Sequence, residues 1–146
     1  MTPVKVKKLN ENAIIPTYGT EFSAGADLYA LPGEKIVIGA HKTVMIHTGL
    51  AMEIPEGYAG LIFARSGLAS KKGLAPANKV GVVDSDYRGE FMVALHNHTD
   101  EDKEIEGGER VAQLVIVPFL KAAFDVAYEL SDTVRGEGGF GSTGKK

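Results

Sequence analysis

The chain has 146 residues, a formal net charge of −3 and no cysteine. A chain of this length forms one domain with a real hydrophobic core, because it can bury roughly two-thirds of its unfolded surface. The missing cysteine excludes disulfides, thiol catalysis and cysteine-bound zinc, and the acidic balance argues against broad nucleic-acid binding, which needs a basic face.

Seven segments alternate with period two or are rich in β-branched residues, and such patterns predict strands. In chain order they are Val4 to Leu9, Lys35 to Ile38, Thr43 to Ile46, Leu61 to Ala64, Phe91 to Asn97, Val111 to Val117 and Phe124 to Tyr128. Glycine accounts for 18 of the 146 residues, which suits frequent turns. Many short strands separated by turns predict an all-β, jelly-roll-like sandwich or barrel.

Only Ser66 to Lys72 has a helical pattern, with Ser66 as the expected N-cap and Gly73 as the expected end. The composition changes at residue 131, so we expect a β domain over residues 1–130 and a flexible, glycine-rich C-terminal arm over residues 131–146. No apolar run reaches the roughly 20 residues of a membrane helix, and the N-terminus has no signal-peptide pattern. We therefore expect a soluble, cytoplasmic or otherwise intracellular protein.

The C-terminal arm ends in a stretch that combines five glycines with phosphate donors and one aromatic side chain. Arg135, Ser142 and Thr143 are donors suited to phosphate oxygens, and Phe140 can stack on a base. Glycine lets the backbone approach a ligand closely. Two interpretations stay open: a disordered tail, or an arm that becomes ordered when a nucleotide phosphate binds.

Two stretches in the first half of the domain are candidate sites. Asp27 is a carboxylate among small residues, which let a ligand or a second chain come close, although a solvated aspartate on a turning strand fits equally well. Arg65, Ser66 and Gly67 follow a strand and open the short helix, where backbone N–H groups and side-chain donors favour anions. An ordinary capped turn is the simpler interpretation of that stretch.

The densest candidate stretch runs from Asn78 to Glu90. An apolar, hairpin-like segment leads into Asp84, Ser85, Asp86 and Tyr87. If the strand continued, alternation would place Asp84 and Asp86 on one face and Tyr87 on the other. A carboxylate here can act as a general base toward water, and a polar turn is the alternative.

Two further polar features lie on predicted strands. Gln113 interrupts an apolar strand at a position that faces the core or a pocket, where it needs hydrogen-bond partners and a positioned water would serve. An edge-facing glutamine is equally possible. His96 and His98 could hold a metal on one strand face, but they lack a third ligand nearby, so solvated or interface histidines are the favoured interpretation.

Taken together, these stretches resemble the five motifs of the trimeric dUTPase family, the deoxyuridine triphosphate nucleotidohydrolases. The motifs occur in the family's order and span nearly the whole chain: Ala24 to Ala30, Ala64 to Gly73, Asn78 to Glu90, Gly108 to Leu114, and Arg135 to Gly144. One departure is Ala64, where the family often has proline, which should change local stiffness more than chemistry.

The resemblance implies a jelly-roll homotrimer with three active sites between subunits. It implies Mg²⁺-assisted hydrolysis of dUTP to dUMP and pyrophosphate by water attack on the α-phosphorus, which keeps uracil out of DNA and supplies dUMP for thymidylate synthesis. Asp84 matches the residue that orients and deprotonates the water, and Gln113 would contact the phosphates and help to hold that water. Asp27 would help to hold magnesium, through water.

The resemblance also implies the substrate contacts. Tyr87 would pack on the sugar where a ribose 2′-hydroxyl would clash, and an arm from a third subunit would cover the uracil with Phe140. The full set of implied substrate-binding residues is Arg65, Ser66, Gly67, Asn78, Gly81, Val82, Val83, Tyr87, Arg135, Phe140, Gly141, Ser142 and Thr143.

Two other functions are weighed against hydrolysis. A dCTP deaminase relative would share the fold and would need a glutamate to activate water against cytosine, for which Glu90 is the nearest candidate. A non-hydrolysing, nucleotide-sensing trimer would keep the fold without the chemistry, but the presence of Asp84, Gln113 and the complete arm argues against it.

Overall fold

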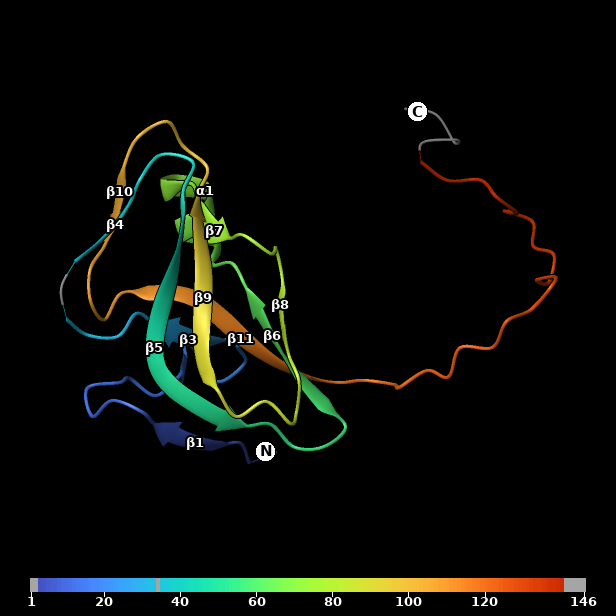
Figure 1. Ribbon diagram of the computed structural model, residues 1–146, viewed down its shortest axis with the longest axis horizontal. Helices are drawn as coiled ribbons and strands as arrows, with labels where there is room; N and C mark the ends of the chain where they lie inside the picture. Colours follow the sequence, from blue (N-terminus) through green and yellow to red (C-terminus); the bar gives the residue numbers. More distant parts are fainter. Residues whose placement is uncertain (1–2, 34, 141–146) are drawn as a thin grey trace.

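The computed structural model describes residues 3–33 and 35–140, which form a β body and an extended C-terminal segment (Figure 1). The elements of the described residues are β1 (Lys5–Lys8), β2 (Thr17–Tyr18), β3 (Ala26–Tyr29), β4 (Ile36–Ile38), β5 (Thr43–Glu53), β6 (Tyr58–Phe63), α1 (Ser66–Lys72), β7 (Leu74–Pro76), β8 (Gly81–Val83), β9 (Glu90–Asn97), β10 (Lys103–Ile105) and β11 (Arg110–Pro118).

The strands pair antiparallel in three sheets. A four-stranded sheet has the order β1-β5-β9-β7, a five-stranded sheet has the order β2-β3-β11-β6-β8, and β10 pairs with β4 in a small third sheet. The core lies between the two larger sheets, since its buried side chains come from β5 and β9 on one side and from β3, β6 and β11 on the other. The predicted all-β, jelly-roll-like fold is confirmed, as a sandwich without a closed barrel.

The side-chain alternation of β9 explains why this segment is a strand. Phe91, Val93 and Leu95 are almost completely buried, while Met92 and Ala94 between them are half-buried. One face of β9 therefore supplies the core, and the other face remains available next to β5, whose Met45 is 47% exposed. This second face borders the pocket described below.

The short helix α1 begins one residue earlier than a serine cap requires. Its N-cap is Arg65, whose side chain makes no capping hydrogen bond, and Ser66 is already the first helical residue. The expectation that Ser66 caps the helix was therefore wrong, because Arg65 is the last extended residue and Ser66 already has helical geometry. Gly73 ends the helix in the left-handed conformation with φ +67°, as predicted. No helix in residues 3–33 and 35–140 is long and apolar enough to cross a membrane.

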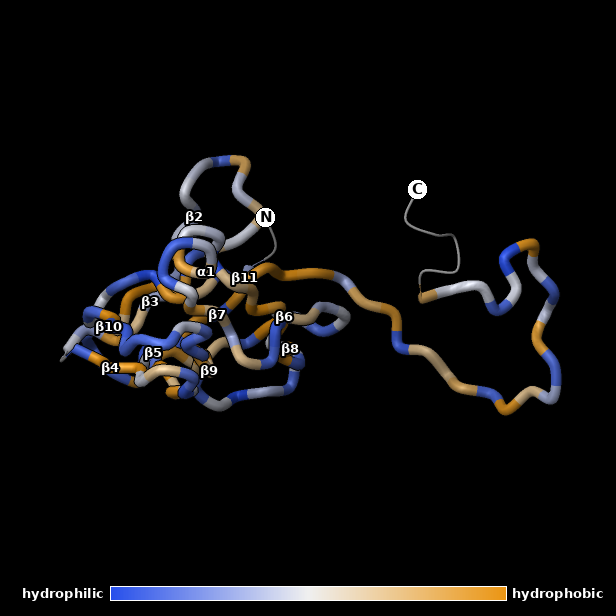
Figure 2. The backbone as a smooth tube through the Cα atoms, turned by 90° about the horizontal axis from the view of Figure 1, so that it is seen from above, coloured by the Kyte–Doolittle hydropathy of each residue, from blue (hydrophilic) through white to orange (hydrophobic). Residues whose placement is uncertain are grey.

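The segment after β11 leaves the body and extends away from it (Figure 1). Hydrophobic and hydrophilic positions alternate along this segment (Figure 2). Six of its large apolar side chains are almost fully exposed: Leu120, Phe124, Val126, Tyr128, Leu130 and Val134. The expected strand from Phe124 to Tyr128 was wrong, because this segment extends away from the body and pairs with none of its strands. The expected strand Thr43 to Ile46 is longer than predicted, since β5 continues to Glu53.

Candidate functional site

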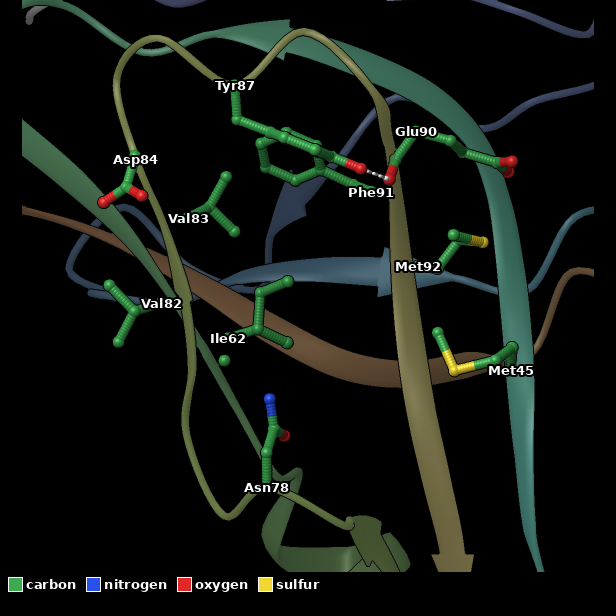
Figure 3. A pocket seen from close by; sticks show the side chains of 11 residues that line it. Met45, Ile62, Asn78, Val82, Val83, Asp84, Tyr87, Glu90, Phe91 and Met92 are labelled. Carbon is green, nitrogen blue, oxygen red and sulfur yellow. Dashed lines mark hydrogen bonds between the residues drawn. The ribbon is translucent and has the colours of Figure 1, made fainter.

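A pocket of about 260 Å³ lies beside β8 and the start of β9 (Figure 3), and we call it the β8 pocket. It brings together six of the substrate-binding and catalytic residues named from the sequence: Asn78, Gly81, Val82, Val83, Asp84 and Tyr87. Asn78 and Tyr87 lie at opposite ends of this pocket, with apolar side chains between them. Glu90, which ends the candidate stretch, also lines this pocket, and the sequence analysis did not name the remaining lining residues Met45, Ile62, Phe91 and Met92 as site residues.

The hairpin that carries β8 is shaped by its backbone. Lys79 has a positive φ of 65°, and its amide donates to the carbonyl of Pro76 at 3.1 Å, which turns the chain into β8. Strand β8 then pairs with β6, with Gly81 opposite Ile62. A Cβ on Gly81 would lie 3.3 Å from the Cβ of Ile62, so glycine leaves room in the part of the pocket nearest Asn78.

The polar stretch after β8 is a turn. Strand β8 ends at Val83, and the amide of Tyr87 donates to the carbonyl of Asp84 at 3.2 Å. Of the two interpretations that the sequence left open, a continuing strand and a polar turn, the structure has the turn. Val83 points toward Ile62, while Val82 and Asp84 lie on the other side of the chain (Figure 3). Asp84 is exposed at the rim, where a carboxylate can reach water.

The ring of Tyr87 forms one wall of the β8 pocket. It packs at a tilt against Phe91, with ring centroids 6.1 Å apart. Its hydroxyl donates to the backbone carbonyl of Glu90 at 3.0 Å, as Figure 3 shows. Gly89 passes directly beneath the ring, because a Cβ there would lie 2.4 Å from the tyrosine oxygen. The ring therefore has a fixed place between Phe91 and a glycine backbone.

Glu90 borders the β8 pocket, but its carboxylate points toward β5 (Figure 3). Its Oε2 pairs with Nδ1 of His47 at 2.9 Å, and its Oε1 accepts from the amide of Gly49 at 2.8 Å. Burial raises the pKa of this carboxyl, but the hydrogen bonds from His47 and from the Gly49 and Thr48 amides outweigh burial and hold the pKa below its ordinary value. Both oxygens of the ionised carboxylate are thus occupied by β5.

A second hollow, of about 580 Å³, lies at the start of α1, and we call it the α1 groove. Five of the residues that line it are candidates named from the sequence: Asp27, Arg65, Ser66, Gly67 and Gln113. The other lining residues are Gly19, Ser23, Ala24, Gly25 and Arg110. Strand pairing brings these candidates together, because Gln113 on β11 lies opposite Asp27 on β3 and opposite Phe63 at the end of β6.

Two arginines share one carboxylate in the α1 groove. Nε of Arg65 donates to Oδ1 of Asp27 at 2.7 Å, and Nη1 of Arg110 donates to Oδ2 at 3.3 Å. The three side chains together have a formal charge of +1, which suits an anion. Arg110 was missed as a site residue, although it stands in the fourth motif at the first position of β11.

Gln113 is half-buried in the α1 groove. Its Nε2 donates to the carbonyl of Ala64 at 2.8 Å. The glutamine Oε1 faces Gly25, where a Cβ would lie only 2.4 Å away. The expectation that this glutamine faces the core or a pocket is confirmed, and its amide is oriented by the backbone just before Arg65.

The β8 pocket and the α1 groove have no lining residue in common. The described arm residues Arg135 and Phe140 line neither of them, and Nε of Arg135 donates to the nearby carbonyl of Gly138 at 2.7 Å. Gly141, Ser142 and Thr143 lie outside the described residues. One chain therefore holds an apolar pocket with a carboxylate at its rim and a separate cationic groove, each with part of the predicted site.

The described residues hold no group of three or more histidine, cysteine, aspartate or glutamate side chains arranged for a metal ion. His96 and His98 lie edge to face with ring centroids 4.5 Å apart, and Nδ1 of His96 is hydrogen-bonded to the Thr43 hydroxyl at 2.9 Å. Two imidazoles are too few for a closed metal site, and the role of this pair stays a prediction.

Comparison with known proteins decides the family. The family model for dUTPase matches residues 11–144. The chain belongs to the dUTPase family. The five motifs that suggested this family lie within the matched range, so the resemblance inferred from the sequence is confirmed.

Curated dUTPase sequences and solved dUTPase structures match this chain over almost its whole length. The deoxyuridine 5′-triphosphate nucleotidohydrolase of Hydrogenobaculum sp. is 50% identical over 141 residues, which are 97% of each chain. That of Nautilia profundicola is 51% identical over 142 residues, covering 97% of this chain and 99% of the relative. A structure of the Staphylococcus bacteriophage 80alpha dUTPase with dUpNHpp superposes with a TM-score of 0.89 at 32% identity and covers 99% of each chain.

One of the similar dUTPase structures is described with a bound metal ion. A variant of the dUTPase from phage phi11 of S. aureus, described as revealing the coordination of a structural Mg(II) ion, superposes on this family member with a TM-score of 0.79. The two are 28% identical, and the match covers 88% of this chain and 98% of the other.

Proposed function

We propose that this chain hydrolyses dUTP to dUMP and pyrophosphate by attack of water on the α-phosphorus. The proposal rests on one observation: the stretch from Asn78 to Tyr87 folds into a single pocket with Asp84 at its rim, in a chain half identical to curated deoxyuridine 5′-triphosphate nucleotidohydrolases. In the cell this reaction would keep uracil out of DNA and supply dUMP for thymidylate synthesis. An intracellular location stays a prediction from the sequence.

The β8 pocket would hold the nucleoside. Its narrow, mostly apolar interior suits a pyrimidine ring, and the backbone of Gly81, Val82 and Val83 with the amide of Asn78 would supply the few polar contacts to the uracil edge. Tyr87 would lie against the sugar, where a 2′-hydroxyl would meet its ring. Selection for uracil and for deoxyribose would thus come from shape as much as from hydrogen bonds.

Asp84 would be the general base. It is exposed at the rim of the pocket, where it can accept a proton from the attacking water. Gln113, held by its hydrogen bond to the Ala64 carbonyl, would contact the phosphates and help to hold that water. The reaction needs mainly positioning and charge neutralisation, and it needs no covalent intermediate.

The α1 groove would bind the triphosphate. Arg65 and Arg110 supply positive charge that Asp27 cancels only in part, and Ser66 and Gly67 are exposed beside them. A triphosphate entering the groove would add strong acceptors for these donors. Rearrangement of the Asp27–Arg65 pair on binding would release donors for phosphate oxygens.

The donor set of the groove fits a hydrated Mg²⁺ better than a directly bound ion. Asp27 is a single carboxylate that already accepts from two arginines, and the described residues provide no cage of three acidic or imidazole ligands. Magnesium usually keeps several waters and binds substrate phosphates, so Asp27 would hold it through water. The ion would supply charge neutralisation at the pyrophosphate leaving group.

The active unit would be a homotrimer. The β8 pocket and the α1 groove are separate on one chain, so a complete site would combine them from neighbouring copies. The arm, for which we propose the range 131–146, would come from a third copy, with Phe140 over the uracil and with Arg135, Gly141, Ser142 and Thr143 at the phosphates. The row of exposed apolar side chains before it supports contact with another chain.

Pyrophosphate release with Mg²⁺ tests this function, run on dUTP beside dCTP, dTTP and UTP. We expect release from dUTP alone, and an Asp84→Asn variant that binds dUTP but loses turnover by about 100-fold or more. Asp86→Asn is the matched control, because Asp86 is also exposed but does not line the β8 pocket. Near-native turnover in Asp84→Asn would refute the role of the base.

The same assay separates the rival functions. Ammonia release from dCTP would indicate a deaminase, although the occupied carboxylate of Glu90 speaks against that activity. Tight binding of dUTP without any pyrophosphate would indicate a sensing module.

A further inference from the structure

Strand β5 bulges where it passes the β8 pocket. Its register with β9 runs regularly down to His47 opposite Met92 and resumes with Ala51 opposite Glu90. Three residues of β5 therefore lie opposite the single residue Phe91. The bulge contains Gly49, which is buried and has a φ of +70°, a conformation that glycine adopts without strain.

Side chains replace the ladder hydrogen bonds that the bulge removes. The hydroxyl of Thr48 donates to the carbonyl of Phe91 at 2.6 Å, and the amide of Gly49 donates to Oε1 of Glu90 at 2.8 Å. Oε2 of Glu90 pairs with Nδ1 of His47 at 2.9 Å. Because an ionised carboxylate only accepts, that nitrogen of His47 must carry the proton. Phe91 and Glu90 are thus both tied to β5.

The same two residues hold the ring of Tyr87. Its hydroxyl donates to the Glu90 carbonyl at 3.0 Å, and its ring packs against Phe91 at 6.1 Å. Gly89 closes the third side, because a Cβ there would lie 2.4 Å from the tyrosine oxygen. The position of the ring therefore depends on a bulge in β5, a strand far earlier in the chain.

We propose that His47 and Glu90 are positioning residues for sugar selection: by fixing the start of β9 against the bulge of β5, they fix the Tyr87 ring and so set the preference for deoxyribonucleotides over ribonucleotides. The inference rests on the proposed function only in that Tyr87 meets the sugar. Glu90 lines the β8 pocket, but both of its carboxylate oxygens are held by His47 and Gly49 on β5, so both side chains would act through the backbone of Glu90.

The geometry favours this role over a purely structural one. The His47 side chain is 58% exposed, so its loss removes little buried surface and little stability. The Glu90 side chain is 21% exposed, and both of its oxygens are oriented toward the bulge next to the pocket rather than toward the core. A loosened pair would let the tyrosine ring move by a small distance, which is enough to admit a hydroxyl.

The test compares deoxyribo- and ribonucleotides in three variants. His47→Ala and Glu90→Gln loosen the pair, and Asp100→Asn is the matched control, since it weakens another exposed histidine–carboxylate pair, His41 with Asp100 at 2.8 Å. The measurements are kcat and KM for dUTP and UTP, the Kd of dUMP and UMP by calorimetry, and Tm. We expect both loosened variants to lose about threefold to tenfold of the deoxyribose preference, mainly through KM and Kd, while the control keeps it.

Equal losses for deoxyribo- and ribonucleotides, with an unchanged ratio, would overturn the inference and leave a structural role. If Glu90→Gln does not fold, His47→Ala tests the pair instead. Gly89→Ala then serves as a second variant, because a Cβ at Gly89 would push the Tyr87 ring directly. The binding ratio keeps the two proposals distinguishable. A wild-type protein that prefers dUMP without hydrolysing dUTP would refute the proposed function, and a lowered ratio in the variants would still support the positioning role.

Discussion

Gly25→Ala should damage catalysis much more than folding. A Cβ on Gly25 would lie 2.4 Å from Oε1 of Gln113, 3.1 Å from its Cδ and 3.2 Å from its Cβ. Ordinary contact starts near 3.4 Å, so the amide end of the glutamine must move by about 1 Å. That end belongs to a flexible side chain, and the contact with the Gln113 Cβ asks the sheet to give by only a few tenths of an ångström.

The size of each effect follows from this movement. Displacing Gln113 weakens its 2.8 Å hydrogen bond to the Ala64 carbonyl, which costs about 1 kcal/mol and lowers Tm by about 3 to 5 °C. Misplacement of a catalytic group by about 1 Å can lower the rate by about 100-fold. We therefore expect kcat for dUTP to fall about 10- to 100-fold in a protein that remains folded.

The assay is pyrophosphate release at saturating dUTP, with Tm measured by calorimetry on the same samples. Gly33→Ala is the matched control, because a Cβ at Gly33 would meet nothing within 4 Å. If Gly25→Ala keeps kcat within about twofold of the wild type, then either Gln113 does not act in the reaction or its position does not matter, and the reasoning fails.

Three further predictions concern stability and the arm. Asn97→Leu should lower the free energy of unfolding by about 3 kcal/mol in urea titrations, because the buried amide donates to three backbone carbonyls and accepts from Thr99; a loss below about 1 kcal/mol would contradict this. Glu90 has a lowered pKa when folded, against an ordinary 4.5, so its contribution to stability is present above that pH and is lost as the pH falls through the folded pKa. Glu90→Gln should flatten this acid limb of the stability curve, and an unchanged limb would argue against it. Removing residues 131–146 should keep the Tm and lower turnover at least about tenfold, and an active truncated protein would disprove the role of the arm.

The sequence predicted the parts of the fold that depend on local pattern. Alternation located β9, and Gly73 marked the end of α1. After β8 the sequence left a continuing strand and a polar turn both open, and the chain turns at Asp84, where alternation no longer applies. Alternation failed for the expected strand from Phe124, since a row of alternating apolar side chains does not say whether a strand edge lies within reach.

The contacts that organise the candidate site could not be predicted in this way. Asp27 and Arg65 are 38 residues apart in the sequence, and His47 and Glu90 are 43 apart. Each pairing depends on which strands become neighbours and on their register, and a composition or spacing rule contains neither. The bulge in β5 adds to this difficulty, because its only local signal is one glycine among several.

The β8 pocket and the α1 groove are separate on one chain, with Asp84 at the first and the cationic donors and Gln113 at the second. Under the proposed roles, a free chain would hold the base away from the phosphate donors, and this arrangement would not activate water at the α-phosphorus. Under the proposed assembly, a triphosphate bound across two copies would bring these groups together, and the arm of a third would exclude bulk water. Folding of the single chain and formation of the active site would then be separate events, the first set by the β sandwich and the second by contacts between copies.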